Sequence, residues 1–242
     1  MSLRSLTPAA IAAAAAIGLS APALAHGEHL DVWLTIGADG RLVVGGITEP
    51  DDGPAEYFPG MRVFEGELGE DPQFPFSGDE PGFEMEDGTV DPGTPFTFLV
   101  DGPVTKWNGA GFEATTASLF LAFGPGNVTT GGNWTTGFTF AADSAGGFHN
   151  HFELTLLGDG GADPENGIYL VPMKVAMVGS DSGTPTFWWV LNLGMDEADH
   201  EAAADWVKDN RVVGPCPGDM DGNGTIDMDD LLDLLEAWGT CP

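Results

Sequence analysis

The chain has 242 residues, of which 38 are acidic and 7 are basic, and its formal net charge at pH 7 is −31. A surface this negative repels phosphate backbones and anionic headgroups, which excludes nucleic acid and anionic membranes as partners. The 36 glycines and 18 prolines predict many turns between short elements. The acidity itself has two interpretations, a cation-binding surface or an adaptation to salty surroundings, and composition does not separate them.

Residues 1–25 are typical of an export signal. Arg4 precedes a small, apolar run that ends in Ala-Leu-Ala at residues 23–25, which fits the A-x-A cleavage pattern. Gly18 and Pro22 interrupt this run, which is too short to span a membrane. We therefore expect an exported protein, extracellular, cell-surface or periplasmic, whose mature chain begins at His26. No later stretch approaches the roughly 20 apolar residues of a spanning helix, so no transmembrane segment is expected.

Alternating apolar residues predict β-strands from residue 30 onward. The even positions from Leu30 to Ile36 are apolar, and a turn at residues 38–40 leads to a return strand, which predicts a hairpin. Residues 50–93 are rich in Pro, Gly and acidic residues, and here we expect an irregular excursion with one short strand near residues 61–64. The pattern indicates a mainly β domain over residues 26–210, an antiparallel Ig-like or jelly-roll sandwich. Its further strands are predicted at residues 95–100, 115–123, 134–141, 147–157, 167–178 and 185–193.

One helix is predicted over residues 196–210. Acidic residues at its start and Lys208 near its end favour the helix dipole. Ala198, Ala202 and Trp206 form a stripe that we expect to lie on the sandwich. On the preceding strand Trp188 points outward, where this helix can cover it, although an outward indole can also stack on a sugar ring. Residues 211–215 then form a linker to a C-terminal tail.

Two groups of histidines suggest a transition-metal site. In the segment GGFHNHFELTLLG the apolar residues face the core, which places His149, His151 and Glu153 on the opposite face, about 7 Å apart in succession. His29 and Asp31 share one face of the first strand. If the two strands are neighbours, His29 joins the His-x-His pair in a zinc site. A surface histidine pair without a metal is the alternative.

The expected N-terminus adds a second metal hypothesis. His26 would carry a free α-amine beside its imidazole, so that both nitrogens could hold copper. This arrangement resembles the copper brace of lytic polysaccharide monooxygenases, and the His-Gly start is similar to that of some bacterial members. The resemblance implies copper, a polysaccharide partner and oxidative chemistry. No nucleophile elbow, phosphate loop or His-Glu-x-x-His motif is found, so no other catalytic centre is predicted.

The segment DMDGNGTIDMDD near the C-terminus matches a calcium loop. Oxygen-bearing residues stand at loop positions 1, 3, 5, 9 and 12, and a backbone carbonyl serves at position 7, as a hard cation requires. Gly224 occupies position 6, where the chain turns sharply. Cys216 and Cys241 flank the loop and its helix, and in an exported chain they predict one disulfide. The predicted calcium ligands are Asp219, Asp221, Asn223, Thr225, Asp227 and Asp230.

This loop and the leucine-rich helix after it resemble one half of a type I dockerin, which also uses Asp at position 12. The resemblance covers residues 216–242 and implies calcium binding and a cohesin-like or cell-surface partner. Two features depart from the family: no second repeat is found, and Met228 and Asp229 stand at positions 10 and 11, where many dockerins carry small polar residues. The helix carries an apolar face that needs a cover. That interaction face is formed by Leu231, Leu234, Leu235 and Trp238.

Short segments of the sandwich resemble a group of secreted or surface-anchored bacterial domains. These segments are HLDVWL, FHNHFELTL, NGIYLVPM, and FWWVLNLG followed by HEAAADWV. The resemblance implies metal acquisition or a role that has not been assigned. Together the patterns favour an exported, non-catalytic binding or surface-association protein with a calcium-loading tail. Polysaccharide breakdown, and periplasmic or extracellular zinc capture, are the alternative functions.

Overall fold

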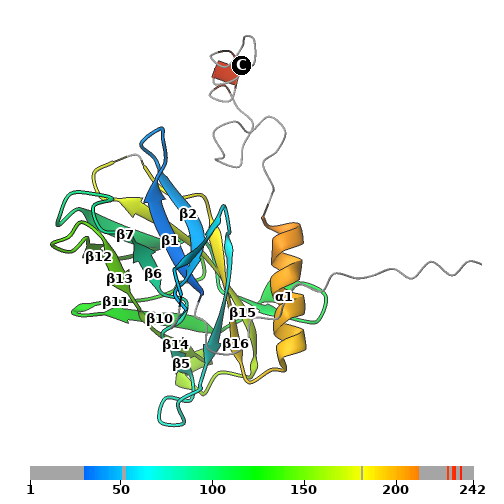
Figure 1. Ribbon diagram of the computed structural model, residues 1–242. Helices are drawn as coiled ribbons and strands as arrows, with labels where there is room; N and C mark the ends of the chain where they lie inside the picture. The colour runs from blue at the N-terminus through cyan, green and yellow to red at the C-terminus, as the bar shows by residue number, and fades with distance from the viewer. Residues whose placement is uncertain are drawn as a thin grey trace, which may run out of the picture.

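The computed structural model describes residues 30–50, 53–180 and 182–212, together with Met228, Leu231, Leu232 and Leu235 of the tail. The described residues form three β-sheets (Figure 1). The five-stranded sheet has the order β13 (Phe148–Asn150), β6 (Phe83–Met85), β1 (Leu30–Ile36), β2 (Leu42–Thr48), β3 (Glu56–Pro59). The four-stranded sheet has the order β11 (Gly126–Thr129), β10 (Ser118–Phe123), β14 (Glu153–Leu157), β5 (Ser77–Gly78).

The seven-stranded sheet forms the other layer of the sandwich. Its main path has the order β12 (Thr135–Ala141), β7 (Pro95–Val100), β15 (Gly167–Met177), β16 (Phe187–Leu193), β4 (Val63–Leu68). The short hairpin of β8 (Thr105–Trp107) and β9 (Phe112–Ala114) pairs with β15 beyond the end of β7. A 3-10 turn, η1 (Asp159–Gly161), follows β14. Side chains from all three sheets meet in one continuous core, so the predicted mainly β sandwich is confirmed.

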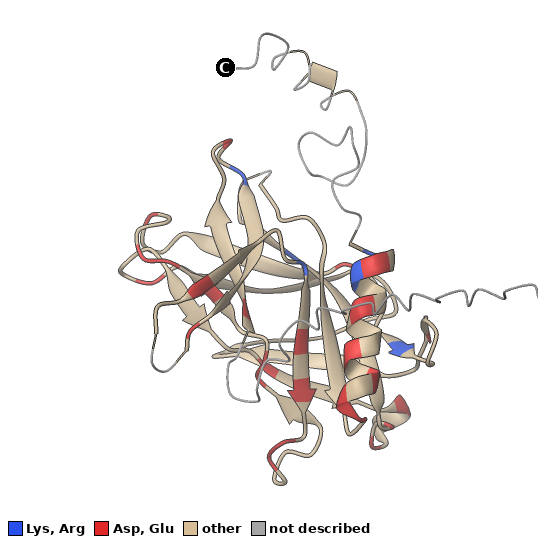
Figure 2. Ribbon diagram, turned by 45° about the vertical axis from the view of Figure 1, so that its right-hand side comes forward, with Lys and Arg blue, Asp and Glu red and all other residues tan. Residues whose placement is uncertain are grey.

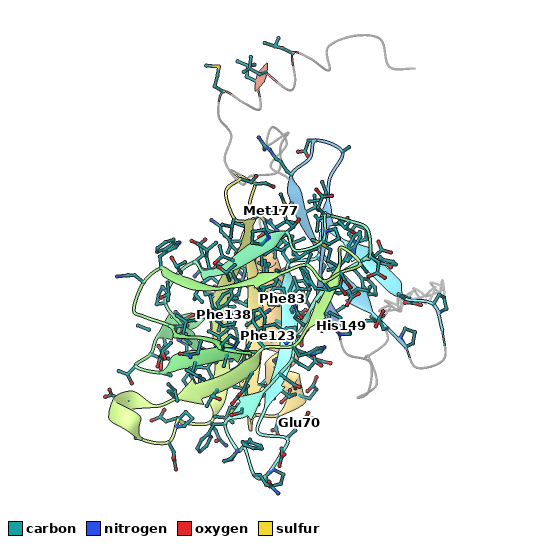
Figure 3. The ribbon with its side chains drawn as sticks, turned by 90° about the vertical axis from the view of Figure 1, so that its left-hand side faces the viewer. Glu70, Phe83, Phe123, Phe138, His149 and Met177 are labelled. Carbon is teal, nitrogen blue, oxygen red and sulfur yellow. The ribbon has the colours of Figure 1, made fainter. Side chains whose placement is uncertain are left out.

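The centre of this core is aromatic. Phe152 has no exposed surface, and five other phenylalanine rings lie with their centroids 5.0 to 5.5 Å from its ring. Figure 3 shows three of these rings inside the molecule, between the two layers. Aromatic pairs at this spacing stabilise a core beyond the area they bury. The five rings belong to Phe83, Phe98, Phe123, Phe138 and Phe140.

The hairpin of β1 and β2 is confirmed, with Leu30 opposite Thr48 and Ile36 opposite Leu42. The segment 50–93 was wrongly predicted, because it contributes four strands, β3 to β6, rather than one. These strands have two to six residues, too few for a period-two pattern to stand out, and three of them, β4, β5 and β6, pair with strands distant in sequence. β8, β9 and β11 are equally short and were not predicted either. The sheets are also not purely antiparallel, since β1–β6 and β4–β16 pair in parallel.

Helix α1 (Glu197–Asn210) packs on the outer face of the seven-stranded sheet (Figure 1). Its buried residues are His200, Ala203, Ala204 and Val207, which contact Val63, Ile168, Leu170 and Val190 of the sheet. The predicted stripe was wrong in part, since Ala198 and Ala202 are exposed. The helix is mostly alanine and charged residues, so periodicity alone distinguishes its faces poorly, and the polar His200 marks the buried one. Figure 2 shows acidic residues along its length.

Two tryptophans extend the contact beneath α1. Trp206 is half-buried and packs edge-on against Trp107 and Phe112, with ring centroids 6.1 and 5.6 Å away. Trp188 is partly buried against the same apolar cluster, to which α1 also contributes. Within the described part of the chain, no helix combines the length and apolar character needed to cross a bilayer.

His200 ties α1 to the sheet through both of its ring nitrogens. Nε2 lies 2.8 Å from the Val190 carbonyl and Nδ1 lies 3.0 Å from a Glu67 carboxylate oxygen. Both partners are acceptors, so both nitrogens carry hydrogens and the ring is an imidazolium. Burial alone would lower the pKa of His200, but the hydrogen bonds to Glu67 and Val190 and the charge of Glu65 outweigh it and raise the pKa.

We predict that His200→Gln lowers the free energy of unfolding by about 2 kcal/mol at pH 6, because a buried acceptor loses its donor. A raised folded pKa means that the imidazolium stabilises the fold fully below the unfolded value of 6.5 and stops doing so as pH rises through the folded value. The difference in the free energy of unfolding between wild type and variant, measured by urea denaturation, should therefore decrease from pH 6 to pH 9. The exposed Glu201→Gln is the control, within about 0.5 kcal/mol of wild type. An equal loss at both pH values would mean that the ring is neutral.

Candidate metal centre

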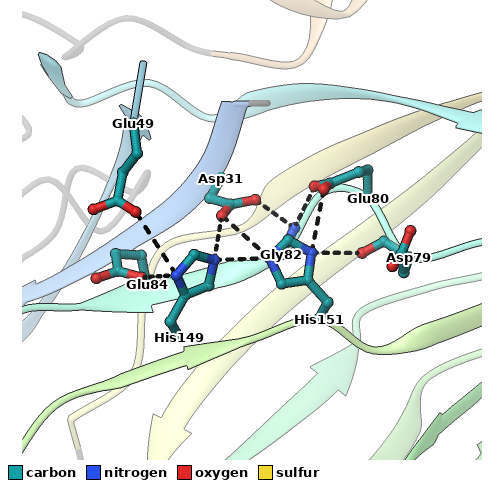
Figure 4. Close-up of polar contacts among 8 residues, drawn as sticks. All are labelled: Asp31, Glu49, Asp79, Glu80, Gly82, Glu84, His149 and His151. Carbon is teal, nitrogen blue, oxygen red and sulfur yellow. Dashed lines mark hydrogen bonds and ion pairs between the residues drawn. The ribbon is translucent and has the colours of Figure 1, made fainter. Parts of the chain in front are cut away.

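Three neighbouring strands bring the candidate ligands together on the outer face of the five-stranded sheet. Strand β6 lies between β1 and β13, and its Glu84 is opposite Trp33 on β1 and His149 on β13. Core residues such as Val32 alternate with these outward ones, which also turns Asp31 away from the core centre. His151 follows directly after β13. The site therefore lies where β1, β6 and the end of β13 meet (Figure 4).

Two imidazole nitrogens and one carboxylate oxygen converge at this point. The Nε2 atoms of His149 and His151 are 2.8 Å apart. Asp31 Oδ2 lies 3.2 Å from the first and 3.7 Å from the second. Ligand atoms of a tetrahedral zinc ion, with bonds near 2.1 Å, lie about 3.3 Å from each other. Each of the three separations therefore differs by about half an ångström or less from the one that a metal ion requires.

Carboxylates contact the opposite side of both rings. His149 Nδ1 lies 3.2 Å from Glu84 Oε2 and 3.8 Å from Glu49 Oε2. His151 Nδ1 lies 3.2 Å from Glu80 Oε1. The Glu80 carboxylate accepts a hydrogen bond from His151, which keeps a hydrogen on Nδ1 and directs the Nε2 lone pair toward the centre of the site; Glu84 Oε2 lies beside His149 Nδ1 without a hydrogen bond. Metal-binding histidines are oriented by carboxylates in this way.

The surroundings of the site raise the pKa of three of its ionisable groups. The hydrogen bond that His151 donates to the Glu80 carboxylate outweighs burial and raises the pKa of His151 to about 9. Burial, followed by the charges of Glu49 and Asp31, raises the pKa of Glu84 to about 7. Burial is also the main cause that raises the pKa of Asp31. Two Nε2 lone pairs at 2.8 Å repel unless a cation lies between them, and a proton on His151 supplies one. A metal ion would replace that proton.

Gly82 leaves the room in which the ligands meet. A Cβ atom at this position would lie 2.8 Å from His151 Cε1 and 2.9 Å from Asp31 Oδ1. The Gly82 amide also donates a hydrogen bond of 2.7 Å to Asp31 Oδ1, which leaves Oδ2 for the histidines. A side chain here would push apart two of the three ligands.

Several predicted ligands have different outcomes. The structure brings His149 and His151 together and adds Asp31 to them. Glu153 is exposed on β14 and is not part of this group. The prediction treated residues 147–157 as one strand, but the chain crosses from the five-stranded to the four-stranded sheet at residues 151–152. Glu153 is exposed, as the alternation predicted, but it belongs to a different sheet from His149. His26 and His29 lie outside the described residues.

The tail is described only in part. All six predicted calcium ligands and both cysteines lie outside the described residues, as do Leu234 and Trp238. Met228, Leu231, Leu232 and Leu235 are helical and exposed.

Sequence reasoning missed the supporting residues of the site. Glu80, Gly82 and Glu84 lie in the segment predicted to be irregular, and Glu49 immediately precedes it. The alternation Phe83-Glu84-Met85 was a signal for an outward Glu84, but three residues are too few to carry a prediction. Nothing local marks Gly82, because its role depends on side chains from two distant strands.

A second group of possible ligands lies under α1. Donor atoms of Glu65, Glu197 and His200 lie within 4.8 Å of one another. Both nitrogens of His200 already face acceptors, the Val190 carbonyl and Glu67. Its ring therefore has no lone pair for a metal, and this group is a structural ion-pair network.

The chain was compared with known proteins. No protein-family model matches it, and no curated protein matches it either. The geometry of the site therefore carries the functional argument.

We predict that Gly82→Ala weakens zinc binding at least about tenfold, because its Cβ displaces His151 and Asp31. The atoms it meets belong to side chains, so far-UV circular dichroism should not change. Gly132→Ala is the matched control, since a Cβ there meets nothing within 4 Å. Isothermal titration calorimetry compares the two variants with wild type. Equal affinity for all three proteins would contradict this account of the site.

Proposed function

We propose that this protein is an exported, non-catalytic metal-binding protein whose sandwich holds one divalent transition metal ion, with zinc the best candidate. The observation that carries the proposal is the convergence of His149 Nε2, His151 Nε2 and Asp31 Oδ2, each within 3.7 Å of the other two. Two imidazoles with one carboxylate form a ligand set that suits zinc.

The accessibility of the site supports reversible binding. The His149 side chain is 45% exposed and that of His151 is 29% exposed, so an ion can reach both rings from solvent. Three protein ligands leave a fourth position of a tetrahedral ion for water or another small ligand. Capture of a free ion is the role that such an open site serves best.

The charge around the site also favours a cation. Asp31, Glu49, Glu80 and Glu84 surround the two rings, and burial disfavours ionisation of Asp31 and Glu84. A divalent ion would offset this negative charge locally. The net charge of −31 would further concentrate cations near the surface.

We further propose that the tail loads calcium and attaches the protein to a cohesin-like or cell-surface partner. The oxygen-ligand spacing from Asp219 to Asp230 supports calcium binding. The exposure of Leu231, Leu232 and Leu235, at 47, 51 and 55%, supports an apolar surface available to a partner.

We predict that the metal-free, calcium-saturated protein binds one zinc ion with a dissociation constant on the order of 1 μM or lower, about 8 kcal/mol of binding free energy. His149→Ala should weaken this binding at least about 100-fold, because it removes a ligand. Glu153→Gln is the control and should bind as wild type does. Calorimetric titration measures all three, and equal binding by wild type and His149→Ala would refute the site. Copper and nickel titrations then establish the preferred metal.

For the tail, we predict that millimolar calcium increases the helical circular dichroism signal, because neutralised carboxylates allow the loop and its helix to order. The double variant Asp219→Ala and Asp230→Ala should lose the response. His149→Ala should keep it, which separates the calcium loop from the transition-metal site. A wild-type spectrum that does not change with calcium would overturn the assignment.

A further inference from the structure

The candidate metal site lies at a break in a β-ladder. Residues 77–85 and 148–157 run antiparallel, and β6 pairs with β13 up to Phe83 opposite Asn150. Pairing resumes between β5 and β14, with Gly78 opposite Leu154. Between these pairs, residues 79–82 face residues 151–153 without ladder pairing. Both segments pass here from one sheet to the other. We call this interruption the seam.

Side chains of the metal site bridge the seam where the ladder is missing. His151 Nδ1 lies 3.2 Å from the Asp79 carbonyl. The Gly82 amide donates to Asp31 Oδ1 at 2.7 Å, and the Gly82 carbonyl accepts a hydrogen bond of 3.0 Å from the Val32 amide. Two of the three candidate ligands therefore also hold the seam together: His151 joins the two crossing segments, and Asp31 joins the first of them to β1.

The seam also adjoins the aromatic centre of the core. Phe152, directly after His151, is fully buried against the rings of Phe83 and Phe140. Movement of His151 away from Asp31 would therefore displace Phe152, the residue at the centre of the aromatic core. The metal site and the core packing are linked through one peptide bond.

We infer that the bound metal ion acts as a clamp on the seam, joining β1, β13 and the crossover into one unit. The inference rests on the proposed metal binding. Asp31 belongs to β1, His149 to β13 and His151 to the crossover, so one ion bonded to all three joins segments that do not pair directly with one another; in the sheet, β1 and β13 are joined through β6. Opening the seam separates His151 from Asp31 and releases the ion. Metal binding and seam opening then exclude each other.

Hydrogen–deuterium exchange of the full calcium-loaded chain tests the clamp. In metal-free protein, peptides covering residues 79–84 and 150–154 should exchange faster than the β15–β16 ladder, because the seam lacks ladder pairing. With free zinc at 100 times its dissociation constant, exchange in the seam should slow about 100-fold, since each opening must first release the ion. The β8–β9 hairpin, which opens without disturbing the site, should keep its exchange rate.

His149→Ala is the matched variant. Its side chain contacts the site but no backbone group of the seam, so its seam should exchange as in metal-free wild type and should not respond to zinc. Zinc that binds wild type at one equivalent without slowing the seam would overturn the clamp and leave the proposed function intact. Seam and β15–β16 segments that exchange equally in metal-free protein would also overturn it. Absence of zinc binding by calorimetry would overturn both.

Discussion

The hydrogen bond between the Gly82 amide and the Asp31 carboxylate is the contact on which the site depends. At 2.7 Å it fixes one carboxylate oxygen in a nearly buried position and directs the other toward the histidines. A backbone donor to a carboxylate is a strong and directional hydrogen bond. Without it, only the backbone hydrogen bond from the Val32 amide to the Gly82 carbonyl described above would hold Gly82 to β1, and Asp31 would have no defined orientation toward His149 and His151.

The described histidines show how surroundings determine the role of one residue type. His200 has an acceptor at each nitrogen, so it is a buried cation that joins helix and sheet. His149 and His151 have carboxylates beside Nδ1 and face each other through Nε2. The Nε2 lone pairs of His149 and His151 are therefore directed at a common point, whereas His200 has no lone pair to offer. The contacts of His200 stabilise the fold, and the arrangement of His149 and His151 suits a metal ion.

The position of the site explains why its negative charge is tolerated. Strand pairing brings Asp31 and Glu84 close together and the seam adds Glu80. Repulsion of Asp31 by the other two costs free energy that hydrogen bonds only partly offset. Protons relieve this repulsion in the metal-free protein, and a divalent ion would relieve it more fully. The acidic composition, which had two interpretations, thus has at least one local feature that favours cation binding.

Some of this architecture was readable in the chain itself. The period-two pattern predicted the β1–β2 hairpin, β7, β12, β15 and β16, because a long strand that buries alternate side chains has alternating apolar residues in its sequence. The charge pattern predicted α1. The outward direction of His149 followed from the same alternation. The calcium loop remains a prediction from its spacing alone.

Sequence by itself therefore determined the β class, the long strands and the identity of the two histidines. Only the tertiary structure decided that Asp31 and Gly82, 51 residues apart, lie in contact, and that Glu84 lies opposite His149. It also decided which face of α1 is buried. Local periodicity records whether a side chain is buried, but it does not record which distant strand lies beside it. A site assembled from short strands and a break in a ladder is set by those pairings.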